Sequence, residues 1–251
     1  MLISPNITIF EEGFGEFDSE VIPYLLRHVD MWLSSAAGIE PFSSRMVYVC
    51  HSEHGPMCCL NSDSSHTIIL SATGNYWLQW VFQFAHEYCH HLIDGPMDGD
   101  TTGLLWFEEV LCHTASLYAL SRLEELLTLP QSEGTPQGSA PATRLKYLAP
   151  SVRSYIANCH QWIFYTAREL RQLVAEGHLD IREGVYPRKT YNIAAASILP
   201  LFQGGSTLWR IIPHIGNIRQ YPSLDTLFAH LLRESDTTYT RLLLLLRSFF
   251  L

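Results

Sequence analysis

The expected fold is decided by residues 76–93, which read YWLQWVFQFAHEYCHHLI. Apolar residues recur there at helical spacing, so the pattern predicts a helix over this segment. His86 and His90 are four residues apart and therefore share one face of the helix, where two imidazoles can bind one Zn²⁺. Glu87 lies about a quarter turn away, where it can act as the general base that accepts a proton from water.

A third metal ligand is expected from the next apolar segment, residues 105–111, which read LWFEEVL. A zinc site that catalyses hydrolysis needs three protein ligands and one open position. Glu109 follows His90 with 18 residues between them. That gap is long enough for the first helix to end, for a loop to turn, and for a second helix to bring a carboxylate back to the metal.

Together the two segments resemble the gluzincin zinc metallopeptidases, the group of thermolysin and the M1-like aminopeptidases. The resemblance rests on His-Glu-x-x-His, the 18-residue gap, and Glu in a Trp-apolar-x-Glu setting, and it covers residues 75–120. It implies one Zn²⁺ held by His86, His90 and Glu109. It also implies that Glu87 is the general base, that Glu108 points away, and that the substrate is a peptide or protein.

Two other families with related motifs fit the sequence less well. Metzincins require Gly three residues after the second His and a third His three beyond it, where this chain has Ile93 and Pro96. Intramembrane site-2 proteases also carry His-Glu-x-x-His, and residues 64–85 are uncharged. However, residues 71–75 break that stretch into a strand pattern and a helix pattern, so we expect no membrane span.

The resemblance also implies a Tyr or His from the C-terminal half that stabilises the oxyanion formed during hydrolysis. Tyr191 is the first candidate, because its surroundings resemble the Tyr-x-x-Gly-Ala stretch of M1-like enzymes, with Ala194 in place of Gly. Tyr186 is the alternative. His113 stands where thermolysin-like enzymes have Asp, and it can orient Glu109, contact substrate, or be a buried packing residue. His91 is expected at the surface or at an interface, because it lies about 100° around the helix from His90.

The fold class expected is α+β and zincin-like. Residues 1–128 form a small mixed α/β half that carries the zinc-binding helices, with strands near 6–10, 45–50, 58–63 and 66–70. Residues 129–143 are rich in Pro, Gly and Ser and predict a flexible loop or linker. Residues 144–251 form an all-helical half, with helices near 151–176, 191–202, 206–212, 223–233 and 236–249. The resemblance implies that the cleft lies between the halves and that an edge strand, residues 66–70, binds extended peptide.

Composition limits the partners and the compartment. The chain is 47% hydrophobic and 16% charged, which is typical of a globular protein. Its net charge of −9 and the absence of a basic cluster argue against a nucleic-acid partner. No signal peptide is recognisable, and the six cysteines are expected as thiols, so a cytoplasmic setting is predicted. A protein exported by a dedicated secretion machine would look the same, and nothing in the sequence sets the oligomeric state.

The function expected is zinc-dependent peptide hydrolysis. An endopeptidase is favoured, because residues 66–75 contain no acidic residue to anchor a substrate amine, whereas M1 aminopeptidases carry Gly-x-Met-Glu-Asn upstream of the zinc helix. Two alternatives remain: a catalytically inactive binding or regulatory protein on a zincin scaffold, and a zinc hydrolase that acts on a non-peptide acyl bond. The second is open because polarising a carbonyl serves amides and esters alike.

Overall fold

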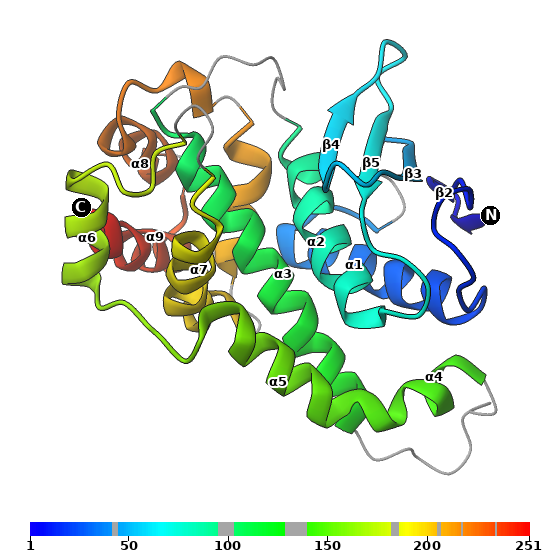
Figure 1. The fold of residues 1–251 in the computed structure, drawn as a ribbon. Helices are drawn as coiled ribbons and strands as arrows, with labels where there is room; N and C mark the ends of the chain where they lie inside the picture. The colour runs from blue at the N-terminus through cyan, green and yellow to red at the C-terminus, as the bar shows by residue number, and fades with distance from the viewer. Residues whose placement is uncertain are drawn as a thin grey trace.

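The computed structural model describes residues 1–41, 45–94, 103–128, 140–181, 186–204, 207–216, 218–233 and 235–251. Its N-terminal part contains a five-stranded sheet in the order β1-β2-β3-β5-β4 (Figure 1). The strands are β1 (Leu2–Ser4), β2 (Ile7–Ile9), β3 (Val47–His51), β4 (Met57–Leu60) and β5 (His66–Leu70). The inner strands β2, β3 and β5 are parallel to one another, while β1 and β4 run antiparallel to their neighbours at the two edges.

Two helices pack against this sheet and against each other, α1 (Val21–Ala37) and α2 (Trp77–Ile93). Alternate residues of β3 and β5 are buried, as expected for strands with one face on a core. The connection from β2 through α1 to β3 joins two parallel strands, which a helix crossover allows. Helix α2 follows β5 directly, so the sheet fixes where the His-Glu-x-x-His run begins.

Helix α3 (Leu105–Thr128) is the central element of the molecule and contacts α2, α5 and α7 (Figure 1). Its residues 109–117 are all buried. Nine consecutive residues cover every face of a helix, so α3 is enclosed on all sides there. Polar side chains in this stretch therefore bond either to the backbone of α3 itself, as Thr114 does, or to neighbouring helices, as Ser116 does with the Phe82 carbonyl of α2.

The remainder of the described chain is helical. Its α-helices are α4 (Ala140–Leu145), α5 (Ala149–His160), α6 (Ala167–Ala175), α7 (Arg188–Phe202), α8 (Leu224–Arg233) and α9 (Thr237–Phe250). Three 3₁₀ segments accompany them, η1 (Lys146–Leu148), η2 (Thr207–His214) and η3 (Ile218–Gln220). All six cysteines are free thiols. Within the described ranges, no helix has the length and apolar character needed to cross a bilayer.

The mixed α/β character predicted for the chain is confirmed, with corrections to individual elements. Strand β1 was not expected. The single helix predicted over residues 151–176 is two helices, because Gln161 and Trp162 adopt left-handed backbone angles, φ 54° and 59°, that end α5. Part of the predicted linker is helix α4, and residues 129–139 lie outside the described residues. The division into two halves stays a prediction.

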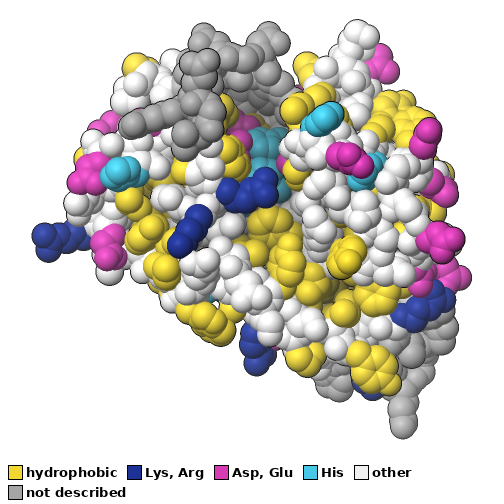
Figure 2. All heavy atoms as spheres, viewed as in Figure 1, with side chains coloured by type: hydrophobic (Ala, Val, Ile, Leu, Met, Phe, Trp, Pro, Cys, Tyr) yellow, Lys and Arg dark blue, Asp and Glu magenta, His cyan; other side chains and the backbone are white. Residues whose placement is uncertain are grey.

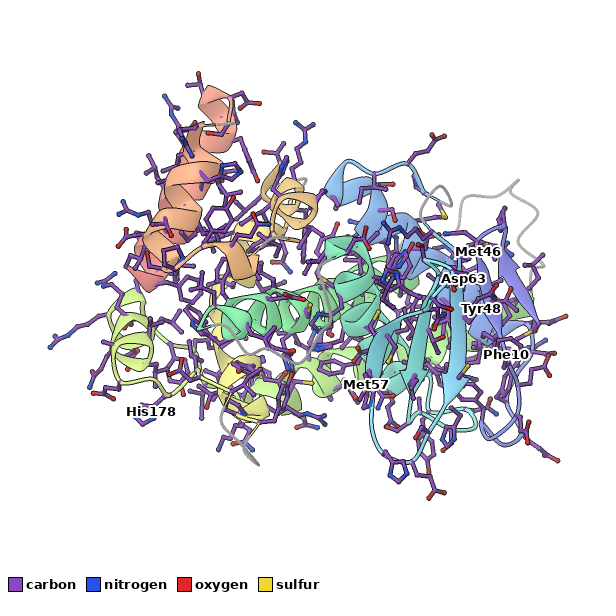
Figure 3. The ribbon with its side chains drawn as sticks, turned by 90° about the horizontal axis from the view of Figure 1, so that it is seen from above. Phe10, Met46, Tyr48, Met57, Asp63 and His178 are labelled. Carbon is purple, nitrogen blue, oxygen red and sulfur yellow. The ribbon has the colours of Figure 1, made fainter. Side chains whose placement is uncertain are left out.

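The expectation about the edge strand is wrong. Strand β5 pairs with β3 on one side and β4 on the other, so its hydrogen-bonding groups are already used. The edge is β4, the strand nearest the helical part of the molecule (Figure 1). Seen from above, Met57 of β4 lies at the side of the sheet that faces the helices, whereas Phe10 lies at the opposite side (Figure 3).

Candidate metal centre

Helices α2 and α3 pack side by side and bring the predicted ligands together. His86 Nε2 lies 3.3 Å from Glu109 Oε2, and His90 Nε2 lies 3.5 Å from Glu109 Oε1. Two ligands of one tetrahedral Zn²⁺ are separated by about 3.4 Å when each bond is about 2.1 Å. Each nitrogen–oxygen pair is therefore spaced as two ligands of an ion of this size, but the group whose ligand atoms all lie within 4.8 Å of one another is His86, Glu109 and His113, without His90.

Glu108 does not point away from this cluster, contrary to expectation. Its Oε1 accepts a 2.7 Å hydrogen bond from Nδ1 of His90, and both side chains are largely buried. When His90 is neutral, the state in which imidazole binds metal, a proton on Nδ1 leaves a lone pair on Nε2, the atom that faces Glu109. Metal-binding histidines commonly have such an acceptor on the other ring nitrogen, because it fixes the tautomer and the ring orientation.

The charges of this group are strongly coupled. Burial acts to lower the pKa of His90, but Glu109 and Glu108 outweigh it and raise that pKa well above its usual value. Burial acts to raise the pKa of Glu109, but His90 and His86 hold it well below its usual value. In the absence of an ion, the His90 imidazole thus acts as the positive partner of a buried carboxylate, the role that a bound cation would take over.

His113 lies in the same cluster. One ligand atom from each of His86, Glu109 and His113 lies within 4.8 Å of the other two, and this buried group can hold one metal ion. His113 Nδ1 donates a 2.7 Å hydrogen bond to Oδ1 of Asn192 on α7. Burial, together with the nearby His86, lowers the pKa of His113 well below its usual value, so its ring is neutral and Nε2 presents a lone pair.

The two candidate tyrosines have different surroundings. The Tyr186 hydroxyl donates a hydrogen bond to Glu109 Oε2 and lies 3.1 Å from His113 Nε2. The Tyr191 hydroxyl is buried and donates a 2.7 Å hydrogen bond to the carbonyl of Leu179. The structure therefore brings the Tyr186 hydroxyl into the cluster and directs the Tyr191 hydroxyl away from it.

A cavity of about 530 Å³ opens onto the cluster. Glu87 lines it and is 4% exposed. Burial raises the pKa of the Glu87 carboxyl, although His86 and His90 act to lower it. Figure 2 shows histidine side chains at the bottom of a hollow, with basic side chains next to them and hydrophobic ones extending away. The remaining lining comes from Pro56, Met57, Cys58, Gln79, Phe82, Gln83, His86, His90, Leu105, Glu108, Glu109, His113, Tyr155, Tyr186 and Arg188.

The opposite face of α2 is fixed by buried polar contacts. The Tyr88 hydroxyl donates a 2.7 Å hydrogen bond to Asp30 of α1. His91 is buried, not at the surface as expected, and its Nδ1 lies 2.7 Å from Nδ1 of His66 on β5. These contacts fix the orientation of α2 about its own axis, and this orientation directs His86 and His90 toward α3.

Sequence reasoning missed two partners of this centre, Glu108 and Asn192. The position of Glu108 next to the predicted ligand Glu109 was a signal that it could contact the centre. No local pattern marks Asn192, which lies 79 residues from His113 in the sequence. No family model, curated protein or solved structure matches this chain. Its function must therefore be argued from the geometry of this centre.

Proposed function

We propose that this protein is a zinc-dependent metallopeptidase that cleaves within peptide chains. The observation that carries the proposal is the placement of the His86 and His90 Nε2 atoms at 3.3 and 3.5 Å from the Glu109 oxygens, beside buried Glu87 and a cavity. Two imidazoles and a carboxylate are a ligand set of hydrolytic zinc sites. A bound zinc ion would supply a Lewis acid that polarises the scissile carbonyl and acidifies water.

The roles of the chain's own residues follow from their positions. His86, His90 and Glu109 hold the ion, and Glu108 orients His90. Glu87 accepts a proton from the attacking water and passes it to the leaving amine, a task that its buried carboxyl with a raised pKa suits. In this proposal Tyr186 replaces Tyr191 as the donor to the developing oxyanion, because only the Tyr186 hydroxyl is directed into the cluster.

The arrangement of the sheet supports a peptide as substrate. Strand β4 is an edge, and its first residues, Met57 and Cys58, line the cavity. An extended peptide can add to such an edge through main-chain hydrogen bonds, which places its backbone across the cavity. The His-Glu-x-x-His helix follows β5, as the resemblance implies, but the edge strand beside the cavity is β4 and not β5.

The test is metal analysis of purified wild type and Glu87→Gln, combined with a peptide-library cleavage screen. We expect about one zinc per chain in both proteins, and a cleavage rate in Glu87→Gln that is lower by about 10²- to 10⁴-fold. Glu12→Gln is the matched control, because Glu12 is exposed at the surface. Undiminished turnover in Glu87→Gln, or no stoichiometric metal in wild type, would refute the proposal.

One observation favours a second candidate, a metal-binding protein without catalytic activity. His113 is close enough to His86 and Glu109 to act as a further ligand, and four protein ligands leave no position for substrate. His113→Gln separates the two. A closed site, in which His113 is a ligand, loses metal affinity in this variant, whereas a catalytic site held by His86, His90 and Glu109 keeps its metal.

A further inference from the structure

Arg188 stands at the rim of the cavity and is not explained by metal binding or proton transfer. It is the first residue of α7, two residues after Tyr186, and its guanidinium carbon lies 5.9 Å from the centre of the Tyr186 ring. Among the described residues that line the cavity, Arg188 supplies the only Lys or Arg side chain, whereas Glu87, Glu108 and Glu109 supply carboxylates.

The Arg188 side chain has no carboxylate partner in the described chain. Five other arginines form ion pairs with Asp or Glu: Arg45, Arg122, Arg144, Arg153 and Arg247. Within the described ranges, no carboxylate oxygen lies within ion-pair distance of the Arg188 guanidinium. Arg188 nevertheless lines the same cavity as Glu87 and the predicted metal ligands.

The position of this cation suits a negatively charged group of a ligand. A guanidinium presents donors in a planar fork that matches a carboxylate, so such a contact can be bidentate. The protein as a whole carries a net charge of −9, which repels acidic peptides. A basic side chain that lines the cavity therefore gives a local attraction that the net charge of the protein does not give.

We infer that Arg188 binds a carboxylate of the substrate, so that the preferred peptides carry an acidic side chain or a free C-terminus close to the bond that is cleaved. The inference rests on the proposed peptidase function and names its substrate class. An acidic side chain and a free C-terminus present the same carboxylate group to the guanidinium, but they differ in which peptide bond is cleaved. A side chain permits cleavage anywhere along a chain, whereas a terminal carboxylate restricts cleavage to the last residues.

The experiment uses fluorescence-quenched octapeptides in which Glu or Gln is scanned through each position, each made with a free and an amidated C-terminus. Wild type, Arg188→Gln and Arg188→Lys are compared, with Lys189→Gln as the matched control, because Lys189 is an exposed cation next in sequence that does not line the cavity. We expect wild type to favour one carboxylate by about tenfold in KM, the strength of a charge-assisted contact at a partly exposed site. Arg188→Gln removes the preference, Arg188→Lys keeps part of it, and Lys189→Gln keeps all of it.

A second readout separates this inference from the proposed peptidase function. Binding of the same peptides, fluorescently labelled, is measured by anisotropy in the zinc-loaded Glu87→Gln protein with and without Arg188→Gln. Cleavage without any carboxylate preference, or a preference that survives in Arg188→Gln, overturns the inference and leaves the peptidase function standing. Absence of cleavage refutes the peptidase function, and the anisotropy measurement then tests the role of Arg188 by itself. Carboxylate-dependent peptide binding that is lost in Arg188→Gln supports the inference. Equal binding of the Glu and Gln peptides overturns the inference.

Discussion

At the scale of single residues, Tyr186 and Tyr191 lie five positions apart in sequence and differ in what their hydroxyl groups contact. Tyr186 contacts Glu109, and Tyr191 contacts the Leu179 carbonyl in the interior. We predict that Tyr186→Phe lowers kcat by about 10²-fold with little change in KM, because an oxyanion donor acts in the transition state. Steady-state kinetics on a cleaved library peptide gives both constants.

The same comparison predicts a different effect for Tyr191→Phe. Loss of its hydroxyl leaves the buried Leu179 carbonyl without this donor, which costs about 1–3 kcal/mol of unfolding free energy. We expect lower stability in urea denaturation and a kcat close to wild type. The assignment of roles would be reversed if Tyr191→Phe abolished turnover in a folded protein while Tyr186→Phe remained active.

Glu108 gives a prediction about metal affinity. Its contact with His90 Nδ1 holds the ring so that Nε2 faces Glu109. Removing such a partner typically lowers metal affinity by about 10- to 100-fold, so we expect this loss in Glu108→Ala. Zinc competition with a chromogenic chelator measures it, with Glu12→Ala as control. An affinity equal to wild type would show that Glu108 does not orient the ligand.

At the scale of elements, the sequence predicts what depends on local spacing. The helical period of residues 76–93 and the 18-residue gap to Glu109 are local features, and the ligands they predict lie on α2 (Trp77–Ile93) and α3 as expected. The buried position of His91 depends on how α2 is rotated against the sheet, which contacts far apart in sequence determine. Likewise, β4 lies outside β5 because a hairpin joins them, and strand order of this kind is set by connections and not by strand composition.

The His66–His91 pair between β5 and α2 predicts how stability depends on pH. Burial, with a contribution from His66, lowers the pKa of His91 to about 3, and burial also lowers the pKa of His66. Unfolded histidines titrate near about 6.5. Between pH 6.5 and pH 3 the unfolded chain therefore binds more protons than the folded chain, and unfolding becomes easier as pH falls.

We expect His91 alone to account for about 2 kcal/mol of the unfolding free energy lost between pH 6.5 and pH 5. Urea denaturation of the chelator-treated protein across this range measures the loss. In His91→Gln, the unfolding free energy falls by about that much less between pH 6.5 and pH 5. The control His214→Gln, which changes an exposed histidine, loses as much unfolding free energy as wild type. Parallel pH profiles for wild type and His91→Gln would contradict the buried, neutral state of this ring.

At the scale of the whole molecule, the metal centre joins the part built on the sheet to the central helix. His86 and His90 come from α2, which packs on β5, and Glu109 comes from α3, which contacts the C-terminal helices. The cluster therefore lies between α2 and α3. An ion held there contacts both helices at once, so its binding reports on the packing of α2 against α3.

Removal of the ion should accordingly lower the stability of the entire fold. An ion that binds only the folded state adds about 2.7 kcal/mol at a free concentration 100 times its Kd, and each kcal/mol shifts Tm by about 2–4 °C in a protein of this size. We therefore expect saturating zinc to raise the Tm of the chelator-treated protein by about 5–10 °C in differential scanning calorimetry. Glu87→Gln keeps this response because it retains the three ligands, whereas His86→Ala loses most of it. A zinc response equal in His86→Ala and wild type would mean that the ion binds elsewhere, and the assignment of His86, His90 and Glu109 as its ligands would fail.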